Sequence, residues 1–147
     1  LNYIQRKLID INYHLYGSIK YLDKYGYPKT VNDLSKHSFI SYGRGAPSPV
    51  FNPDWALKLG MKDGKKRKTV MKVNSVYGLL LAVQSGVGIA ALPDYLTVNV
   101  PNIVKVLPKI EGPITEAHFV YPQSLKNVAR VQAFRNFLYS KISEWKF

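Results

Sequence analysis

Residues 74–96 carry the clearest pattern of apolar and polar positions in the chain. One helix face is predicted by apolar side chains that recur at three- and four-residue spacing, namely Val76, Leu79, Leu80 and Val83. Gly86 and Gly88 then predict the end of this helix and a tight turn. The following residues, 87–92, are apolar on both faces, which is typical of a strand covered by helices on both sides. The pattern therefore predicts an open α/β sheet.

Weaker patterns predict the other elements. Residues 1–8 are expected to form an extended lead-in, and apolar alternation predicts a strand over residues 9–16. Ser18 and Thr30 are of types common at helix N-caps and are predicted to begin short helical segments. Further strands are expected over residues 38–42, 55–59, 68–73, 103–107 and 115–121. An apolar stripe predicts a last helix over residues 125–145.

Asn74 and Ser75 lie where an alternating strand, residues 69–73, meets the predicted helix. Both residue types are good N-caps, so the simplest interpretation is that one of them caps its own helix. The free N–H groups of a helix start also attract carboxylate, phosphate or sulfate, and ligands of open α/β sheets collect outside the carboxyl ends of the strands. The two roles are compatible, and the residue pattern leaves both open.

The composition excludes several classes of protein. With 147 residues, 46% of them hydrophobic, the chain can bury a core, and no apolar run approaches the length of a membrane-spanning helix. The absence of cysteine excludes disulfides and thiolate catalysis. The three histidines lie far apart, and Gly86 and Gly88 lack the third glycine of a dinucleotide fingerprint. We therefore expect no enzyme activity, no metal, no cofactor and no membrane partner.

The net charge of +12 raises the question of nucleic-acid binding, because lysine and arginine neutralise phosphates. The only dense cluster is residues 62–68, which we expect to be the solvated tip of a hairpin pairing residues 55–59 with 68–73. No helix-turn-helix, zinc finger or aromatic RNA-binding strand accompanies this cluster. A phosphate-contacting loop is the alternative, and it would make the chain a basic nucleic-acid-binding protein.

A set of short motifs follows in order along almost the whole chain: Ser18-Ile-Lys-Tyr21-Leu22, Tyr25-Gly26-Tyr27-Pro28, Asp33-Leu34 with His37, the glycine-to-proline run 86–93, Val104-Lys-Val-Leu107-Pro108, Val120-Tyr121-Pro122 and Ala129-Arg-Val131-Gln-Ala-Phe134. Together they resemble the C-terminal regulatory region of LysR-type transcriptional regulators. Ile19 and Tyr25 depart from that pattern, which usually has proline and histidine at these positions.

The resemblance implies an α/β fold like that of type 2 periplasmic binding proteins, with one complete lobe and part of a second lobe. Residues 1–8 would be the end of the first lobe and the crossover, and residues 9–102 the second regulatory lobe. Residues 103–147 would be the return crossover and the C-terminal part of the first lobe. That lobe would be incomplete at its N-terminal side, so apolar surface on residues 115–121 and on the last helix would invite self-association.

The function implied by the resemblance is that of a ligand-sensing regulatory domain. It would bind a small, anionic effector between two lobes and so control DNA binding by a separate winged helix-turn-helix domain that this chain lacks. The partners would be the small-molecule effector and further copies of the chain, with DNA contacted only through the missing N-terminal domain. A cytoplasmic location is expected. The alternative is part of a free-standing type 2 solute-binding protein.

Carried over position by position, the effector-binding residues would be Ser18, Tyr42, Gly43, Arg44, Val73, Asn74 and Ser75. Ser18 and Ser75 would offer hydroxyl and backbone donors, and Tyr42 a ring against the effector body. Arg44 would pair with a carboxylate, although it could equally be a solvated loop arginine, and Tyr42 could be packed in the core. His14 and His37 are expected to be satisfied structural residues rather than ligands.

Overall fold

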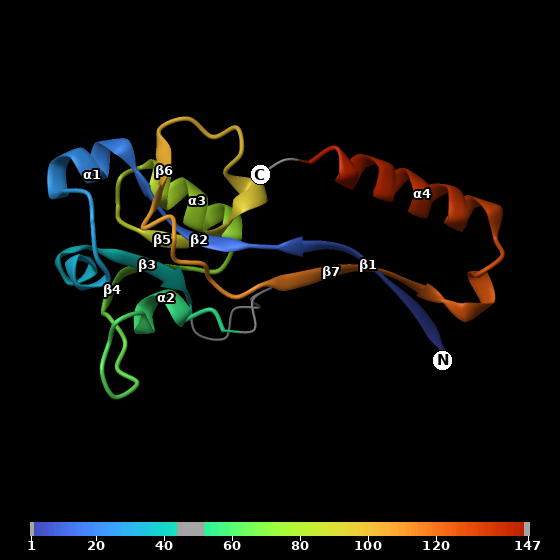
Figure 1. Cartoon of the computed structure of the whole chain (residues 1–147), viewed down its shortest axis with the longest axis horizontal. Helices are drawn as coiled ribbons and strands as arrows, with labels where there is room; N and C mark the ends of the chain where they lie inside the picture. The colour runs from blue at the N-terminus through green and yellow to red at the C-terminus, as the bar shows by residue number, and fades with distance from the viewer. Residues whose placement is uncertain (1, 44–51, 146–147) are drawn as a thin grey trace. The chain divides into compact units, whose positions relative to one another are not determined.

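The computed structural model describes residues 2–43 and 52–145, which belong to two compact units (Figure 1). The larger unit is Asn12–Ile114, and the smaller combines Leu1–Ile11 with Thr115–Phe147. Within the described residues, no helix has the length and apolar character needed to cross a membrane.

A three-stranded and a two-stranded sheet form the centre of the larger unit. Their strands are β2 (Tyr13–Ser18), β3 (Phe39–Tyr42), β4 (Thr69–Val73), β5 (Ala90–Pro93) and β6 (Ile103–Val106). β5 and β6 flank β2 in antiparallel pairing, whereas β3 and β4 pair in parallel. The strand orders are β5-β2-β6 and β3-β4, and an isolated parallel bridge between Phe39 and Ile89, the residue before β5, joins the two sheets.

Side-chain caps explain where the helices of this unit begin. The helical segments are α1 (Ile19–Tyr25), η1 (Val31–Lys36), α2 (Trp55–Lys58), α3 (Val76–Gln84) and η2 (Asp94–Leu96). Ser18 caps α1, because its hydroxyl accepts a hydrogen bond from the Tyr21 amide at 3.2 Å. Thr30 and Asp33 form a capping box at the start of η1. Both predicted helix starts are confirmed.

Two apolar clusters cover the two faces of the sheet. One contains strand residues such as Leu15 and Phe39 together with buried side chains of α1, η1 and α2. The other contains Tyr16 and Ile40, their neighbours along the same strands, together with the buried face of α3. Successive strand residues point to opposite faces, which explains this division. The prediction of a sheet covered by helices on both sides is confirmed.

Gly88 marks a close approach between backbones in the core. A β-carbon at this position would lie 2.5 Å from the carbonyl oxygen of Ser38, which itself accepts a hydrogen bond from the Ile89 amide at 2.8 Å. Gly88→Ala should therefore force β3 and β5 apart and lower the free energy of unfolding by about 2 kcal/mol. Chemical denaturation measures this loss. Gly43→Ala is the control, since its β-carbon would meet nothing closer than 3.9 Å, and equal losses in the two variants would contradict the argument.

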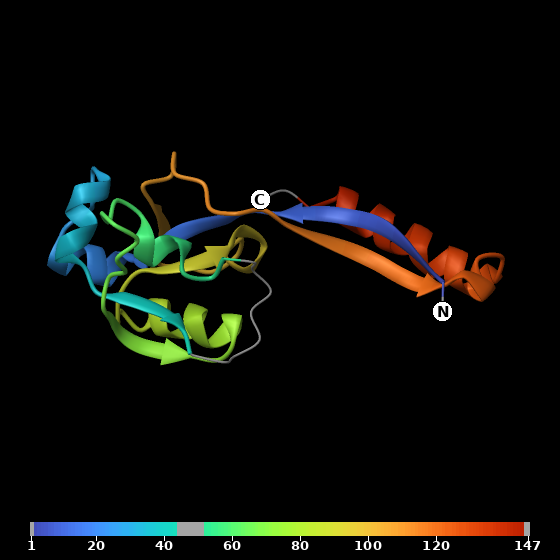
Figure 2. The same cartoon turned by 90° about the horizontal axis from the view of Figure 1, so that it is seen from below.

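The smaller unit is a two-stranded ladder with one helix. β1 (Tyr3–Ile11) pairs antiparallel with β7 (Thr115–Pro122), with an irregularity between Lys7 and Ile9, and η3 (Gln123–Leu125) leads into α4 (Ala129–Ser143). The Tyr139 hydroxyl donates to the carbonyl oxygen of Lys7 at 3.1 Å. The rings of Phe119 and Phe134 meet edge-on with centroids 5.8 Å apart. These contacts hold α4 against the ladder (Figure 2).

Apolar side chains of the smaller unit are exposed in this chain. No residue of α4 is buried, and Phe134 and Phe137 are 52% and 55% exposed. Val120 on β7 is also exposed. Large exposed apolar side chains on one small unit favour association, so self-association stays a prediction for the chain.

The predicted hairpin over residues 55–59 and 68–73 is wrong. Residues 55–58 form helix α2, and β4 pairs in parallel with β3 rather than antiparallel with the earlier segment. The short apolar run Trp55-Ala56-Leu57 does not distinguish a buried strand from a buried helix turn. The basic residues 62–68 therefore form a turn between α2 and β4, in which Arg67 alone is half-buried, with its guanidinium over the Phe39 ring.

The described part of the predicted lead-in, residues 3–8, is extended as expected, but it belongs to a paired strand. Residues 3–11 form strand β1, and the strand predicted over residues 9–16 is divided at Asn12 between β1 and β2. The partner of β1 is β7, more than a hundred residues away along the chain. The alternation of apolar and polar residues is a local pattern and does not indicate such a distant partner. The alternation also continues across Asn12, so it does not mark the boundary between β1 and β2.

Candidate functional site

Two parallel strands and one helix start meet at the edge of the sheet. Tyr42 and Val73 are register partners at the ends of β3 and β4, and the Gly43 amide donates to the Val73 carbonyl at 2.8 Å. Asn74 and Ser75 follow directly and begin α3. Parallel strands end at the same edge of a sheet, so five of the predicted site residues lie side by side here. We call this the α3 face and define it as Tyr42, Gly43, Val73, Asn74 and Ser75.

The start of α3 supplies polar groups to the α3 face. The Ser75 hydroxyl accepts a hydrogen bond from the Gly78 amide at 2.9 Å, and Asn74 and Ser75 are both exposed. The amides of Val76 and Tyr77 have no intrahelical acceptor, because the first turn of a helix supplies none. The first turn also carries no acidic side chain, so the positive end of the helix dipole is not offset there. Such an end favours an anion.

A small apolar cavity adjoins the α3 face. It measures about 20 Å³, which is room for roughly one water molecule, and lies among the end of β3, α2 and the start of α3. Its lining includes Ile40, Ser41, Tyr42, Trp55, Leu57 and Val76. Tyr42 is half-buried and packs against the apolar cluster under α3, and burial raises the pKa of its hydroxyl. The site thus combines backbone donors with an apolar wall.

Two of the predicted effector-binding residues are not part of this group. Ser18 is 1% exposed, its hydroxyl caps α1, and it lies near Gly86 at the C-terminal end of α3. The nine residues of α3 separate it from Ser75 by about 13 Å along the helix axis. Arg44 lies outside the described residues.

Both histidines of the larger unit make the structural contacts expected of them. His37 stacks beside Tyr21, with its Nδ1 atom 3.3 Å from the Tyr21 hydroxyl, and that hydroxyl also accepts from the Ser38 amide at 2.8 Å. Burial lowers the pKa of His37. His14 is buried on β2 and contacts Asp94. Within the described ranges, no three histidine or acidic side chains are grouped as metal ligands would be.

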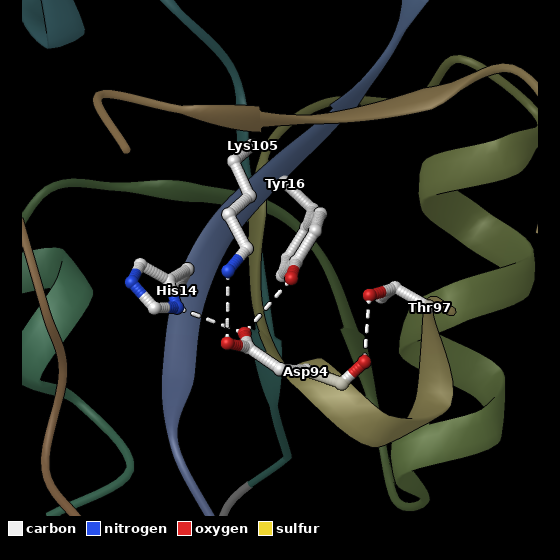
Figure 3. Close-up of polar contacts among 5 residues, drawn as sticks. All are labelled: His14, Tyr16, Asp94, Thr97 and Lys105. Atoms are coloured by element: carbon white, nitrogen blue, oxygen red, sulfur yellow. Dashed lines mark hydrogen bonds and ion pairs between the residues drawn. The ribbon is translucent and has the colours of Figure 1, made fainter. Parts of the chain in front are cut away.

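Our sequence analysis did not identify the buried polar cluster around Asp94, which is 5% exposed (Figure 3). His14 Nδ1 lies 2.8 Å from one carboxylate oxygen, and the Tyr16 hydroxyl donates to the same oxygen at 2.8 Å. The Lys105 ammonium donates to the other oxygen at 2.9 Å, and the Thr97 hydroxyl donates to the Asp94 carbonyl at 2.9 Å. The Asp94 side chain therefore ties η2 to β2 and β6.

Charge and hydrogen bonding decide the protonation of this cluster. Burial alone would raise the pKa of the Asp94 carboxyl, but hydrogen bonds from Lys105, His14 and Tyr16 outweigh it and lower the pKa. Burial and the neighbouring carboxylate raise the pKa of Tyr16. One signal in the sequence could have revealed the cluster: His14 and Tyr16 alternate on one strand, so they share a face, within an otherwise apolar stretch.

A model of the family described as the LysR substrate binding domain matches residues 2–142. An uncharacterized HTH-type transcriptional regulator of Haemophilus influenzae is 28% identical over 123 residues, which cover 81% of this chain and 41% of that protein. The HTH-type transcriptional regulator YhjC of Escherichia coli K12, also uncharacterized, is 26% identical over 135 residues, covering 88% of this chain and 44% of that protein. The chain thus spans less than half the length of these relatives.

Solved structures share the fold. The regulatory domain of CrgA, a LysR-type transcriptional regulator from Neisseria meningitidis, matches with a TM-score of 0.77 and 22% identity, covering 95% of this chain and 69% of that chain. The regulatory domain of AphB from Vibrio vulnificus matches with a TM-score of 0.66 and 19% identity, covering 94% of this chain and 69% of that chain. The predicted α/β class, of the type 2 periplasmic-binding-protein kind, is confirmed. The relatives and solved structures named here are described as transcriptional regulators or their regulatory domains.

Proposed function

The chain belongs to the LysR substrate-binding domain family, and from this membership we propose that it senses a small anionic effector for a transcriptional regulator. The effector binds at the α3 face and alters the DNA contacts of a separate winged helix-turn-helix domain. Asn12–Ile114 is the second regulatory lobe in this proposal, in place of residues 9–102, and β1, β7 and α4 are part of the first lobe. The cytoplasmic location remains a prediction.

The observation that carries this proposal is the start of α3 beside two parallel strand ends. The first-turn amides of α3, together with the exposed side chains of Asn74 and Ser75, offer donors without an acidic neighbour in that turn. The cavity itself holds only about one water molecule, but the apolar side chains around it, Tyr42 and Trp55 among them, form a wall that the organic part of a small acid could contact from outside. A carboxylate at the donors and an apolar group toward the cavity together describe an organic anion.

The solute-binding alternative shares the fold but has no support of its own. The family match and the names of the relatives both point to regulators. The nucleic-acid alternative rests on the basic turn at residues 62–68, and the acidic side chain of Asp54 already pairs with Lys66 there. We therefore assign DNA binding to a domain outside this chain.

A titration of the 147-residue chain with small anions tests the proposal. Calorimetry with acetate, succinate, sulfate and amino acids measures the affinity, and amide chemical shifts locate the site. We expect at least one of these anions to bind and to shift the amides of Gly43 and of residues 74–77, the groups placed at the start of α3. If no anion shifts these amides, or if every shift lies elsewhere, the proposal is wrong.

A further inference from the structure

A second hollow lies on the larger unit, between residues 28–31 and residues 107–110. Its volume is about 450 Å³, within the range of roughly 300–1,000 Å³ typical of small-molecule sites. None of its lining residues lines the cavity beside the α3 face. We call it the 28–110 groove, and nothing in the proposed function uses it.

The floor of the 28–110 groove is held by the core. Val31 and Leu107 line the groove and also pack against the apolar cluster under α1 and α2. Gly60 packs so closely against Val31 that a β-carbon at position 60 would collide with the valine side chain. The Ile110 amide donates to the Leu107 carbonyl at 2.9 Å and closes the turn on the other side. The groove is therefore preformed rather than dependent on a ligand for its shape.

Asp33 fixes the opposite wall. Its carboxylate accepts hydrogen bonds from the Thr30 amide at 2.8 Å, the Lys29 amide at 3.0 Å and the Thr30 hydroxyl at 3.0 Å. These bonds, the one from the Thr30 amide foremost, lower the pKa of the Asp33 carboxyl. This carboxylate is thus committed to the backbone of the loop, and the groove lining itself contains no acidic side chain.

Leu107 stands out in the backbone of this region. Its φ angle is +51°, in the left-handed region that a bulky residue seldom adopts outside a strained turn. Such strain is retained where the surrounding structure enforces it, and it is found preferentially at ligand-binding positions. Here the strain places an apolar side chain on the floor of the groove.

We propose that the 28–110 groove binds a small carboxylate with an apolar ring or branched chain. Apolar side chains make up most of the lining, namely Pro28, Val31, Leu107, Pro108 and Ile110. The charged residues of the lining are both lysines, Lys29 and Lys109, and both are exposed. The apolar body of the ligand covers the floor, and its carboxylate faces the two ammonium groups. This occupant matches the lining in both polarity and charge.

Benzoate is the probe for this site, and benzamide is its neutral counterpart. In a titration of the 147-residue chain followed by amide chemical shifts, we expect benzoate to shift the amides of Thr30, Leu107, Lys109 and Ile110; Pro108 has no amide proton. Benzamide should shift the same amides with an affinity about fivefold lower, because it lacks the charge that the lysines attract. Equal binding of the two compounds, or shifts confined to the α3 face, would overturn the proposal.

Variants separate the groove from the α3 face. Lys29→Gln combined with Lys109→Gln should weaken benzoate about fivefold and leave benzamide unchanged, since only the charge is removed. Pro108→Glu places a repelling carboxylate on an exposed lining residue and should weaken benzoate further. Lys24→Gln combined with Lys36→Gln is the matched control, because both lysines are exposed and neither lines the groove.

The thermal unfolding midpoint of each variant confirms that it is folded before its binding is compared. A double glutamine variant that binds benzoate as tightly as the parent chain would refute the proposal. Ser75→Asp, which alters only the α3 face, should leave benzoate binding at the groove unchanged. The Ser75→Asp measurement therefore distinguishes a wrong proposal about the groove from a wrong proposal about the effector site at the α3 face.

Discussion

Asp94→Ala is expected to lower the free energy of unfolding of the larger unit by about 3 kcal/mol. The substitution removes a buried carboxylate and leaves the His14 ring, the Tyr16 hydroxyl and the Lys105 ammonium without their shared acceptor. The buried His14 ring and Tyr16 hydroxyl lose their acceptor without regaining water, whereas the exposed Lys105 ammonium can be solvated. The two buried donors are why the loss exceeds that of a surface ion pair. Urea denaturation of a Trp145→Phe background measures it, because Trp55 is then the only tryptophan and lies in the larger unit.

Two variants calibrate the Asp94 result. Asp23 is an exposed aspartate that also accepts a tyrosine hydroxyl, from Tyr27 at 2.9 Å, so Asp23→Ala should cost no more than about 0.5 kcal/mol. Tyr16→Phe removes one of the three donors and should cost about 1 kcal/mol. If Asp94→Ala proved as mild as Asp23→Ala, the cluster would not be a main support of the larger unit.

The pKa of Asp94 in this cluster predicts how the free energy of unfolding depends on pH. Because the pKa of Asp94 is lower in the folded chain than in the unfolded one, its contribution is fully present above the unfolded pKa of about 3.9. It is lost as the pH falls below that value toward the folded pKa. Asp94→Asn should therefore lose stability above pH 4 and show a flatter decline than the parent chain below it. Identical acid profiles would contradict this assignment.

The α3 face was predictable because its signals are local. Asn74 and Ser75 are capping residues between an alternating strand and a helical stripe, and this arrangement holds in the structure. Tyr42 and Gly43 could be placed beside them only through the rule that parallel strands end at one edge of a sheet. Ser18 caps a helix, but it lies at the end of β2, which runs opposite to β3, so the structure does not place it beside the α3 face.

Features that depend on long-range pairing were beyond the sequence. Trp55, Ala56 and Leu57 are three successive apolar residues, and only their packing under the sheet makes them a helix turn. Pairing of β4 with β3 in parallel requires the long connection between them, which hydropathy does not reveal. Asp94 contacts residues of two strands, the farthest of them His14, eighty positions away along the chain. The alternation of His14 and Tyr16 indicates a polar face on one strand, but it does not identify Asp94 or Lys105 as the partners.

Ser75→Asp should abolish most effector binding at the α3 face without harming the fold. Aspartate caps a helix as well as serine does, and its charge is favourable at the positive end of α3. The same charge would lie within about 5 Å of a bound carboxylate, where repulsion of about 1.4 kcal/mol or more lowers the affinity at least tenfold. Calorimetry with the best anion from the panel measures the loss, and the unfolding midpoint should stay equal or rise.

Ser75→Asn separates the charge from the change of side chain. Asparagine is a comparable N-cap and carries no charge, so its affinity for the anion should stay within about threefold of the parent chain. Charge is then the only property that distinguishes the two variants at the cap. Equal losses in both would show that the serine hydroxyl itself, rather than the positive helix end, binds the effector. Undiminished binding in Ser75→Asp would mean that the anion does not approach α3 at all, and the proposed effector site would be wrong.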